Sequence, residues 1–321
     1  MMTDDRAKAL RLQKPEKIPV TVSFLPAAWI RHRERLAELV GQFACLFERS
    51  PVPDDFDGVS LDYEIGVRTD AWGCRWQNLE KGMIGQVVPP HPVPRRELVH
   101  QLRLPVQNDG FPHGFMFLRL FDLRGFDEMM LDFADEPPEL ELLIDKVLQY
   151  NLRQLEETIP PNRTGLPDYL GFGDDLGWQN SLPIRSTQWR RYLKPAFKRF
   201  FADCRTRNYY VYLHTDGYIR EIVDDLFECG VNVLNSQVCV NGLEEMRRLC
   251  QGRICLDADL DRQRLPFWSA DQIDEHVFTL VKTLGTPAGG LWLTAHIGPE
   301  LELEGIKAIL AALKKYRYYF S

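Results

Sequence analysis

Histidine and aspartate residues follow short apolar segments at several points in the second half of the chain. Asp174 and Asp175 come after one such segment, His214 and Asp216 after the next, and His296 after the last. An imidazole beside a carboxylate can move protons as a general acid or base. We therefore expect His214, Asp175 and His296 to be catalytic. We expect Asp174 and Asp216 to bind or orient the substrate.

A second set of side chains is expected to contact the substrate in the same pocket. Two members, Gln237 and Asp261, follow expected strands. The other two, Trp72 and Trp178, lie in irregular segments. Asp257, Asp259 and Asp261 alternate along the chain, and one of the three is expected to face the pocket. The alternative for every member is structural, because tryptophans in irregular segments often fill gaps in packing.

His214 and Asp216, with the distant His296, form one conceivable metal-binding set. Two imidazoles and a carboxylate suit zinc or ferrous iron. The His-x-Asp spacing is common by chance, however, and without a metal the aspartate would orient the imidazole as a proton donor. The sequence leaves both alternatives open.

A regular alternation of strand and helix patterns predicts the elements that must position these residues. From residue 168 onward, short apolar strands and amphipathic helices alternate five times, as in a parallel sheet covered on both faces. The first half is less regular, with strands expected at Gly58–Tyr63 and Phe115–Leu120. The eight expected strands begin near residues 18, 58, 115, 168, 209, 231, 253 and 290.

Eight such strands predict a (β/α)8 barrel of the TIM type, with residues 1–321 forming a single domain. Residues 64–115 are rich in Pro, Gly and Trp and predict a loop or hairpin insertion after the second strand. The expected helices cover about 29–43, 126–134, 138–158, 187–207, 219–229, 243–250, 269–284 and 303–316. An open doubly wound sheet is the alternative, but no Gly-x-Gly-x-x-Gly follows a strand. Because such barrels carry the active site at the carboxyl ends of their strands, the polar residues above should converge.

Composition and charge disfavour several classes of protein. Of the 321 residues, 45% are hydrophobic and 26% charged, as in ordinary globular proteins, and the net charge is −7. Without an extended basic run, no nucleic-acid partner is expected. No apolar segment is long enough to span a membrane, and the N-terminus lacks a signal peptide's apolar core, so we expect a cytoplasmic protein without a membrane partner. The seven cysteines contain no Cys-x-x-Cys and are expected to be reduced and mostly buried.

An ordered set of motifs across nearly the whole chain resembles the uroporphyrinogen decarboxylase superfamily. Two of them are Asp174-Asp175-Leu176-Gly177 and His214-Thr215-Asp216-Gly217. The complete set lies at residues 14–20, 69–76, 173–177, 214–219, 230–237, 259–263 and 289–296. The superfamily contains porphyrinogen decarboxylases and barrel methyltransferases that exchange methyl groups with corrinoid proteins. The resemblance therefore implies a uroporphyrinogen decarboxylase-like barrel.

Two departures from the family pattern indicate which branch of the superfamily the chain resembles. The decarboxylases carry Arg-Gln-Ala-Gly-Arg after the first strand, whose arginines bind the porphyrinogen carboxylates, whereas residues 24–30 of this chain contain no arginine. The zinc-dependent methyltransferases carry His-x-Cys and a late cysteine, where this chain has Asp216 and His296. The pattern is thus most similar to the corrinoid-dependent branch without the zinc cysteines.

The resemblance implies a methyltransferase that moves a methyl group to or from a corrinoid in one-carbon or demethylation metabolism. Cobalamin would be the cofactor, held on a partner corrinoid protein, and a small molecule would be the methyl donor or acceptor. His214 or His296 would supply a proton to the reacting atom. The alternative is a decarboxylase or lyase acting on a small carboxylated substrate or a porphyrinogen, bound by Arg68, Arg75 or Arg119.

Overall fold

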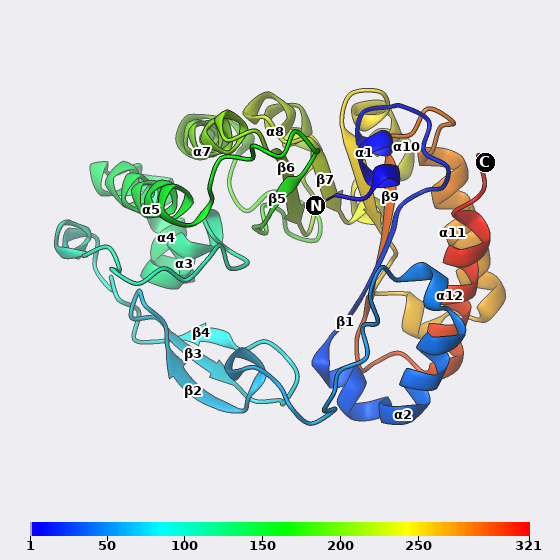
Figure 1. Cartoon of the computed structure of the whole chain (residues 1–321). Coiled ribbons are helices and arrows are strands. Elements are labelled where there is room, and N and C mark those ends of the chain that lie inside the picture. The colour runs from blue at the N-terminus through cyan, green and yellow to red at the C-terminus, as the bar shows by residue number, and fades with distance from the viewer. Residues whose placement is uncertain (1) are drawn as a thin grey trace. The chain divides into compact units, whose positions relative to one another are not determined.

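The computed structural model describes residues 2–321 (Figure 1). By their internal contacts these residues divide into two compact units. The first unit contains residues 67–77 and 86–234, and the second contains residues 3–66, 78–85 and 235–321. The assignment of residues 1–321 to a single domain stays a prediction, and Met1 lies outside the described residues.

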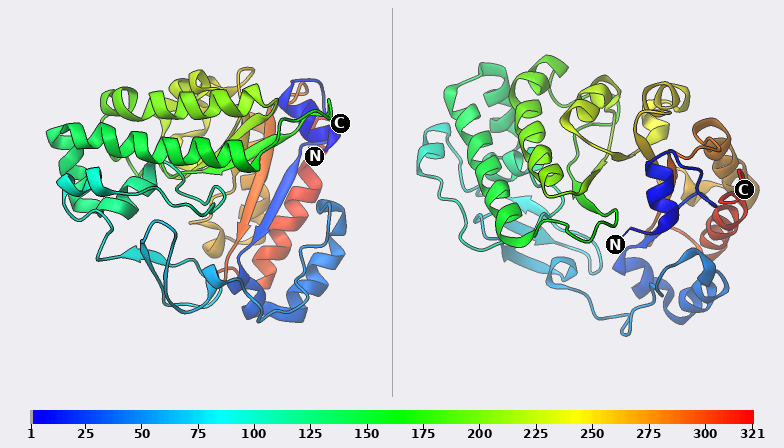
Figure 2. Two further views of the ribbon diagram at one scale, coloured as in Figure 1. Left: turned by 60° about the vertical axis from the view of Figure 1, so that its left-hand side comes forward. Right: turned by 45° about the horizontal axis from the view of Figure 1, so that its top comes forward.

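The first unit contains two parallel strands, β5 (Tyr169–Gly173) and β6 (Tyr210–Thr215), in a register that places Gly173 opposite His214. Helices α5 and α7 lie side by side in this unit (Figure 2). The α-helices of the unit are α3 (Phe117–Arg124), α4 (Phe126–Asp135), α5 (Pro138–Thr158), α6 (Ser186–Gln188), α7 (Lys194–Thr206) and α8 (Val223–Cys229). Shorter turns are the 3₁₀ helices at Arg96–Gln101 and Arg220–Ile222 and the π-helix at Trp189–Leu193.

A cluster of phenylalanines forms the core of the first unit. On α7, Phe197, Phe200 and Phe201 recur at the spacing that places side chains on one helix face, and all three are buried. Phe172 of β5 meets them, with its ring centroid 5.0 Å from that of Phe200 and 5.2 Å from that of Phe115. Burial of each ring stabilises the fold by about 2–3 kcal/mol, so this packing anchors β5 and the segment that precedes α3.

A small antiparallel sheet occupies part of the predicted insertion. Its strands are β2 (Gly66–Thr69), β3 (Arg75–Asn78) and β4 (Gln86–Val88), of which β3 and β4 are antiparallel. These strands lie within residues 64–115, and the assignment of that segment as an insertion into a barrel stays a prediction.

The second unit contains three parallel strands in the order β1 (Val20–Phe24), β9 (Leu291–Ile297) and β8 (Cys255–Asp259). Its α-helices are α1 (Asp4–Leu10), α2 (Pro26–Gln42), α9 (Val238–Asn241), α10 (Leu243–Cys250), α11 (Ala270–Leu284) and α12 (Leu303–Tyr316), and its 3₁₀ helices are Ala44–Leu46, Leu61–Tyr63 and Leu265–Phe267. As expected, Ser269 begins α11, where its hydroxyl accepts from the backbone N–H of Gln272.

Within residues 2–321 the main sheet has six strands in the hydrogen-bonded order β1-β9-β8-β7-β6-β5, where β7 is Val233–Ser236. The chain passes from one unit to the other within β7, after Leu234. Neighbours in the order are consecutive in sequence, except that the first strand lies beside the last. A barrel requires that pairing, whereas a doubly wound sheet reverses its order at a switch point.

Two of the eight expected strands are wrong. Residues 58–63 form coil and a 3₁₀ helix, and the side chain of Leu61 is 81% exposed, so this segment has no sheet to join. Phe115–Leu120 instead leads into α3, because Phe117, Leu120 and Leu123 recur every three residues and are buried on one helix face. The helix expected at about 187–207 is present as α6, the π-helix and α7 in succession, and Arg185 precedes it.

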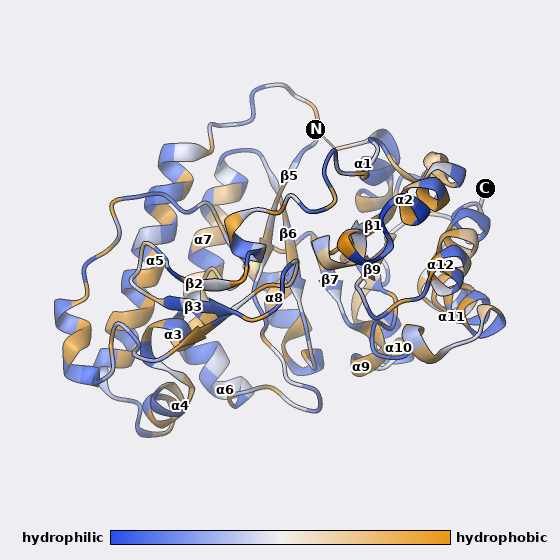
Figure 3. Ribbon diagram, turned by 90° about the horizontal axis from the view of Figure 1, so that it is seen from below, coloured by the Kyte–Doolittle hydropathy of each residue, from blue (hydrophilic) through white to orange (hydrophobic). Residues whose placement is uncertain are grey.

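The helices are amphipathic: along α5 and along α7, hydrophilic residues alternate with hydrophobic ones (Figure 3). In an α-helix this pattern places apolar side chains toward the core and polar ones toward water. Across residues 2–321 we find no helix that is both long and apolar enough to cross a membrane.

Candidate functional site

The loops that follow β5 and β6 are joined by hydrogen bonds. The backbone N–H of Leu176 donates to the Thr215 hydroxyl at 2.9 Å, and that of Gly177 donates to the carbonyl of Asp216 at 3.2 Å. The backbone N–H of Asp216 in turn donates to the carboxylate of Asp175 at 3.3 Å. These bonds bring the two aspartate-containing motifs together at the carboxyl ends of neighbouring strands.

The glycines of the two motifs permit this close approach. A Cβ atom on Gly177 would lie 2.4 Å from the carbonyl oxygen of Tyr218. A Cβ atom on Gly217 would lie 2.3 Å from the backbone of Gly177, and Gly217 also has a φ of +80°. Any side chain at either position would separate the loops, which explains why both motifs end in glycine.

Asp175 is paired with His113, a residue that the sequence analysis did not select. The Nε2 atom of His113 lies 3.1 Å from Oδ1 of Asp175, and the two side chains are 43% and 33% exposed. Burial alone would lower the pKa of His113, but the hydrogen bond and charge of Asp175, with the charges of Asp174 and Asp216, raise it. Burial would likewise raise the pKa of Asp175, but His113, the backbone of Asp216 and the charge of His214 lower it. Both shifts favour the ionised pair.

His214 lies beside this pair. Its Nε2 atom is 3.6 Å from Oδ1 of Asp216, and its ring centroid is 5.5 Å from that of His113. One ligand atom from each of His113, Asp175 and His214 lies within 4.8 Å of the others. We call His113, Asp175, His214 and Asp216 the imidazole–carboxylate cluster. It can hold a proton or a cation next to a bound molecule.

One backbone hydrogen bond and one glycine place His113 at this point. The N–H of Gly114 donates to the carbonyl of Gly173 at 2.8 Å, which ties the segment to the end of β5. A Cβ atom on Gly173 would lie 2.5 Å from Nδ1 of His113, so the imidazole occupies the space that a side chain would fill. His113 lies in an irregular segment without periodicity, where the neighbouring Pro112 and Gly114 are sequence signals that the chain turns.

Asp174, which is expected to bind substrate, is buried and holds the start of α3. Its buried carboxylate accepts hydrogen bonds from the backbone N–H groups of Met116, Phe117 and Leu118, at 3.1 Å for Met116 and 2.9 Å for Leu118. Burial raises the pKa of Asp174 to about 6, although the N–H donors oppose this shift. The carboxylate satisfies groups that a helix N-terminus otherwise leaves without partners. Contact of Asp174 with substrate stays a prediction.

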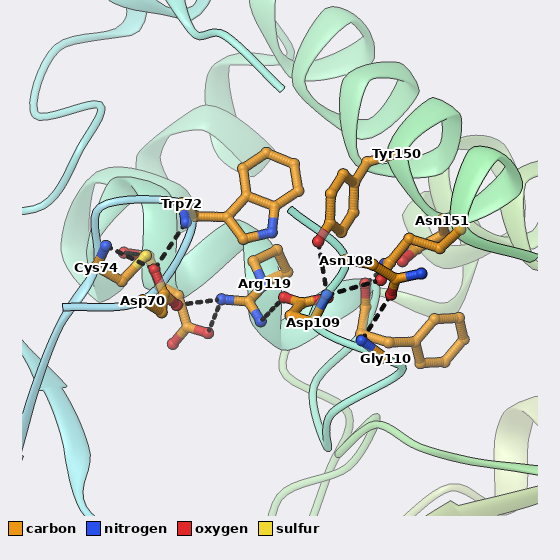
Figure 4. Close-up of polar contacts among 12 residues, drawn as sticks. Asp70, Trp72, Cys74, Asn108, Asp109, Gly110, Arg119, Tyr150 and Asn151 are labelled. Carbon is orange, nitrogen blue, oxygen red and sulfur yellow. Dashed lines mark hydrogen bonds and ion pairs between the residues drawn. The ribbon is translucent and has the colours of Figure 1, made fainter. Parts of the chain in front are cut away.

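A buried arginine lies at the centre of another group in the first unit (Figure 4). The guanidinium of Arg119 is 2.9 Å from Asp70, 3.6 Å from Asp122 and 3.8 Å from Asp109, and its side chain is only 4% exposed. The Tyr150 hydroxyl donates to Asp109 at 2.8 Å. We call these five residues the Arg119 cluster.

Both tryptophans expected to contact substrate lie in the first unit and pack against aromatic rings. Trp72 is buried against Tyr150, with ring centroids 4.7 Å apart, next to the Arg119 guanidinium (Figure 4). This is the packing alternative that the sequence allowed. Trp178 is 44% exposed, and its ring is tilted against that of Phe126 with the centroids 5.6 Å apart. Its contact with a substrate stays a prediction.

The second unit contains its own histidine–aspartate pair. Nε2 of His296 on β9 lies 3.6 Å from Oδ1 of Asp259 on β8, and the same oxygen accepts from the Asn235 amide at 2.8 Å. Burial would raise the pKa of Asp259, but His296, Asn235 and the charge of Arg262 lower it. The Asp259 carboxylate of this histidine–aspartate pair is almost fully buried.

The other candidates of the second unit make structural contacts. Asp257 is buried with Asp259 on the same strand face and accepts from Thr294 at 2.8 Å, because residues two apart on a strand point the same way. The backbone N–H of Asp261 donates to His276, whose pKa burial lowers to about 4. The carbonyl of Gln237 accepts from Val240 and Asn241 at the start of α9, and contact of Gln237 and Asp261 with substrate stays a prediction.

Comparison with models of known protein families shows which family the chain belongs to. The family model described as Uroporphyrinogen decarboxylase (URO-D) matches residues 121–316, which is more than half of the sequence. The chain belongs to the uroporphyrinogen decarboxylase family. The resemblance seen in the ordered motifs is thereby confirmed. No curated protein matches the chain.

One solved structure shares the fold of this chain over nearly its whole length. A methyltransferase from Methanosarcina mazei matches with a TM-score of 0.64 and 19% identity, over 96% of this chain and 96% of that one. A dihydropteroate synthase from Xanthomonas albilineans reaches a TM-score of 0.32 at 14% identity, over 50% of this chain and 54% of that one. The first match shows a common fold, and the expected uroporphyrinogen decarboxylase-like α/β fold is confirmed.

Proposed function

We propose that this protein is a methyltransferase that moves a methyl group between a small molecule and a cobalamin held by a partner corrinoid protein, in one-carbon or demethylation metabolism. The imidazole–carboxylate cluster carries the proposal. It combines two imidazoles and two carboxylates at the carboxyl ends of β5 and β6, where enzymes of barrel type carry their active sites. Membership of the family, and a fold shared with a methyltransferase, support an enzyme of this kind.

The cluster is suited to the part of methyl transfer that a protein must perform. When bound, the corrinoid would accept or donate the methyl group through its cobalt. The chain must hold the small molecule in line and neutralise the charge that develops on the atom losing its methyl group. A cation held between His113, Asp175 and His214 meets that requirement, and the partly exposed side chains leave it accessible.

The decarboxylase alternative needs cationic side chains that bind substrate carboxylates. Arg119 is buried among Asp70, Asp109 and Asp122, which already neutralise it. Arg75 donates to the carbonyl of Pro89. The charges that act most strongly on Asp175 come from imidazoles, not from guanidinium groups. These contacts favour the methyltransferase.

The test follows the visible spectrum of cobalamin. The purified full chain is mixed with methylcobalamin, or with reduced cobalamin, and a panel of methoxylated aromatics, methylamines and methyltetrahydrofolate. We expect a change of cobalt absorption with one class of compound, and a slower change with His214→Ala. No change with any compound would overturn the proposal, and release of carbon dioxide from a carboxylated substrate would favour the alternative.

A further inference from the structure

We propose that His113, Asp175 and His214 form a binding site for one divalent transition-metal ion of the zinc or ferrous iron type. One ligand atom from each residue lies within 4.8 Å of the others. Two imidazoles with one carboxylate are a donor set that these ions accept, and three protein ligands leave a position open for substrate. The proposal rests on the proposed function for the use of the ion, but binding of the ion is independent of it.

The present distances are close to those of a coordinated ion. Ligand atoms about 2.0–2.2 Å from a tetrahedral metal lie roughly 3.4 Å from one another. Nε2 of His113 and Oδ1 of Asp175 are already 3.1 Å apart. The ligand atom of His214 lies within 4.8 Å of both, so the three donors already surround a common position.

The charges around the site also suit a divalent cation. Asp175 contributes one negative charge, and the two imidazoles bind a metal in their neutral form. Asp216 lies 3.6 Å from the Nε2 atom of His214, so its carboxylate can serve as a fourth ligand or accept a hydrogen bond from metal-bound water. The ion would then carry little net charge, which limits its desolvation cost.

The segment that carries His113 is anchored on its C-terminal side. The N–H of Gly114 is bonded to Gly173, and the amide of Asn151 donates to the carbonyl of Phe115 at 2.8 Å. The absence of a side chain at Gly173 leaves room for the imidazole. An anchored histidine loses little conformational freedom when it binds a metal, so the site is largely preformed.

This ligand set differs from a thiolate site. Of the seven cysteines, five are buried in the described residues and none belongs to the group formed by His113, Asp175 and His214. It also differs from the set of His214, Asp216 and His296 that the sequence left open. His113 replaces His296 and Asp175 replaces Asp216, and His113 comes from a segment without a recognisable motif.

The test measures binding of cobalt(II), which reports its ligands through visible absorption. The full chain is treated with a chelator, dialysed and titrated with cobalt(II), and zinc(II) is then added in competition. We expect one equivalent to bind, and His113→Ala to bind about 100-fold more weakly or not at all. His100→Ala is the matched control, because His100 is exposed and contacts only Glu139 among the described ion pairs. Equal binding by His113→Ala would overturn the proposal.

A second variant separates ligation from general loss of structure. In His113→Cys the sulfur can bind the same ion, and we expect a new near-ultraviolet absorption band from thiolate bonded to cobalt. Cobalt(II) that binds this variant without such a band would place the metal elsewhere. Since no methyl donor is present in either titration, metal binding stands or falls separately from methyl transfer.

Discussion

At the scale of single residues, the two neighbouring aspartates after β5 have different roles. Asp174 is buried and accepts three backbone N–H groups, whereas Asp175 is partly exposed and contacts His113. Consecutive residues leaving a strand point in opposite directions, so one carboxylate turns toward α3 and the other toward His113. Substitution of the two residues should therefore give different phenotypes.

Replacement of Asp175 or His214 should reduce activity more than stability. We expect Asp175→Ala and His214→Ala to lower methyl-transfer turnover by about 10²–10⁴-fold, the range typical of groups that assist at the reacting atom. Both side chains are partly exposed, so the far-ultraviolet circular dichroism of the variants should match that of wild type. Rates equal to those of wild type and of His100→Ala would remove these residues from the mechanism.

Asp122 of the Arg119 cluster should make stability depend on pH. Burial raises the pKa of Asp122 to about 6, although Arg119 opposes the shift. A carboxyl with a raised folded-state pKa stabilises the fold below its ordinary pKa of about 3.9, and this contribution is lost as the pH rises through 6. We expect Asp122→Asn to be nearly neutral at pH 4 and more stable than wild type by about 1–3 kcal/mol at pH 8. Denaturant titrations at several pH values measure this, and a pH-independent difference would contradict it.

At the scale of elements, α3 shows how a tertiary contact decides a local structure. Its aromatic sequence suggests a strand, but Asp174 supplies acceptors to its first N–H groups, and Gly125 ends it with a φ of +84°. The same contact secures the segment that carries His113. The helix and the imidazole–carboxylate cluster thus depend on one buried carboxylate.

Loss of that carboxylate should destabilise the protein. Asp174→Ala leaves three backbone N–H groups at the start of α3 without their acceptor, and we expect a loss of about 2–4 kcal/mol in the free energy of unfolding. Urea denaturation measures the change. Asp203→Ala is the control, because Asp203 forms a surface ion pair with Arg199 and should cost less than about 0.5 kcal/mol. Similar losses in the two variants would show that Asp174 does not support α3.

At the scale of the whole molecule, each unit contains its own core. The burial of the cysteines shows how well these cores exclude water. Five of them are buried and Cys239 is half-buried, whereas Cys45 is exposed. Burial also raises the pKa of Cys204, Cys229 and Cys239 to about 12, which keeps their thiols protonated and unreactive. This matches the expected pool of mostly buried cysteines.

The accessibility of these thiols can be measured with a thiol-specific reagent. We expect about one thiol, that of Cys45, to react rapidly in the native protein, Cys239 to react slowly, and all seven to react in denaturant. A Cys45→Ser variant should lose the rapid phase. Rapid reaction of several thiols in the native protein would mean that the two cores are less tightly packed than the structure shows.

Most of the fold could be predicted from the sequence because its elements carry periodic signals. The helix at Pro138–Thr158 and the one at Leu303–Tyr316 have the bounds that their apolar spacing predicts. The errors fall where the pattern is short or irregular, as at Gly58–Tyr63 and Phe115–Leu120. A run of five or six apolar residues is compatible with strand or helix, and only its neighbours select one.

The sequence by itself determined which segments are strands and helices over most of the chain, and that Asp175 and His214 stand at the ends of two of them. Only the tertiary structure decided that His113 joins these residues, and that the carboxylate of Asp174 supports the start of α3. The reason is physical. Periodicity records which face of an element is buried, but the position of a residue in an irregular segment depends on contacts with parts of the chain far away in sequence.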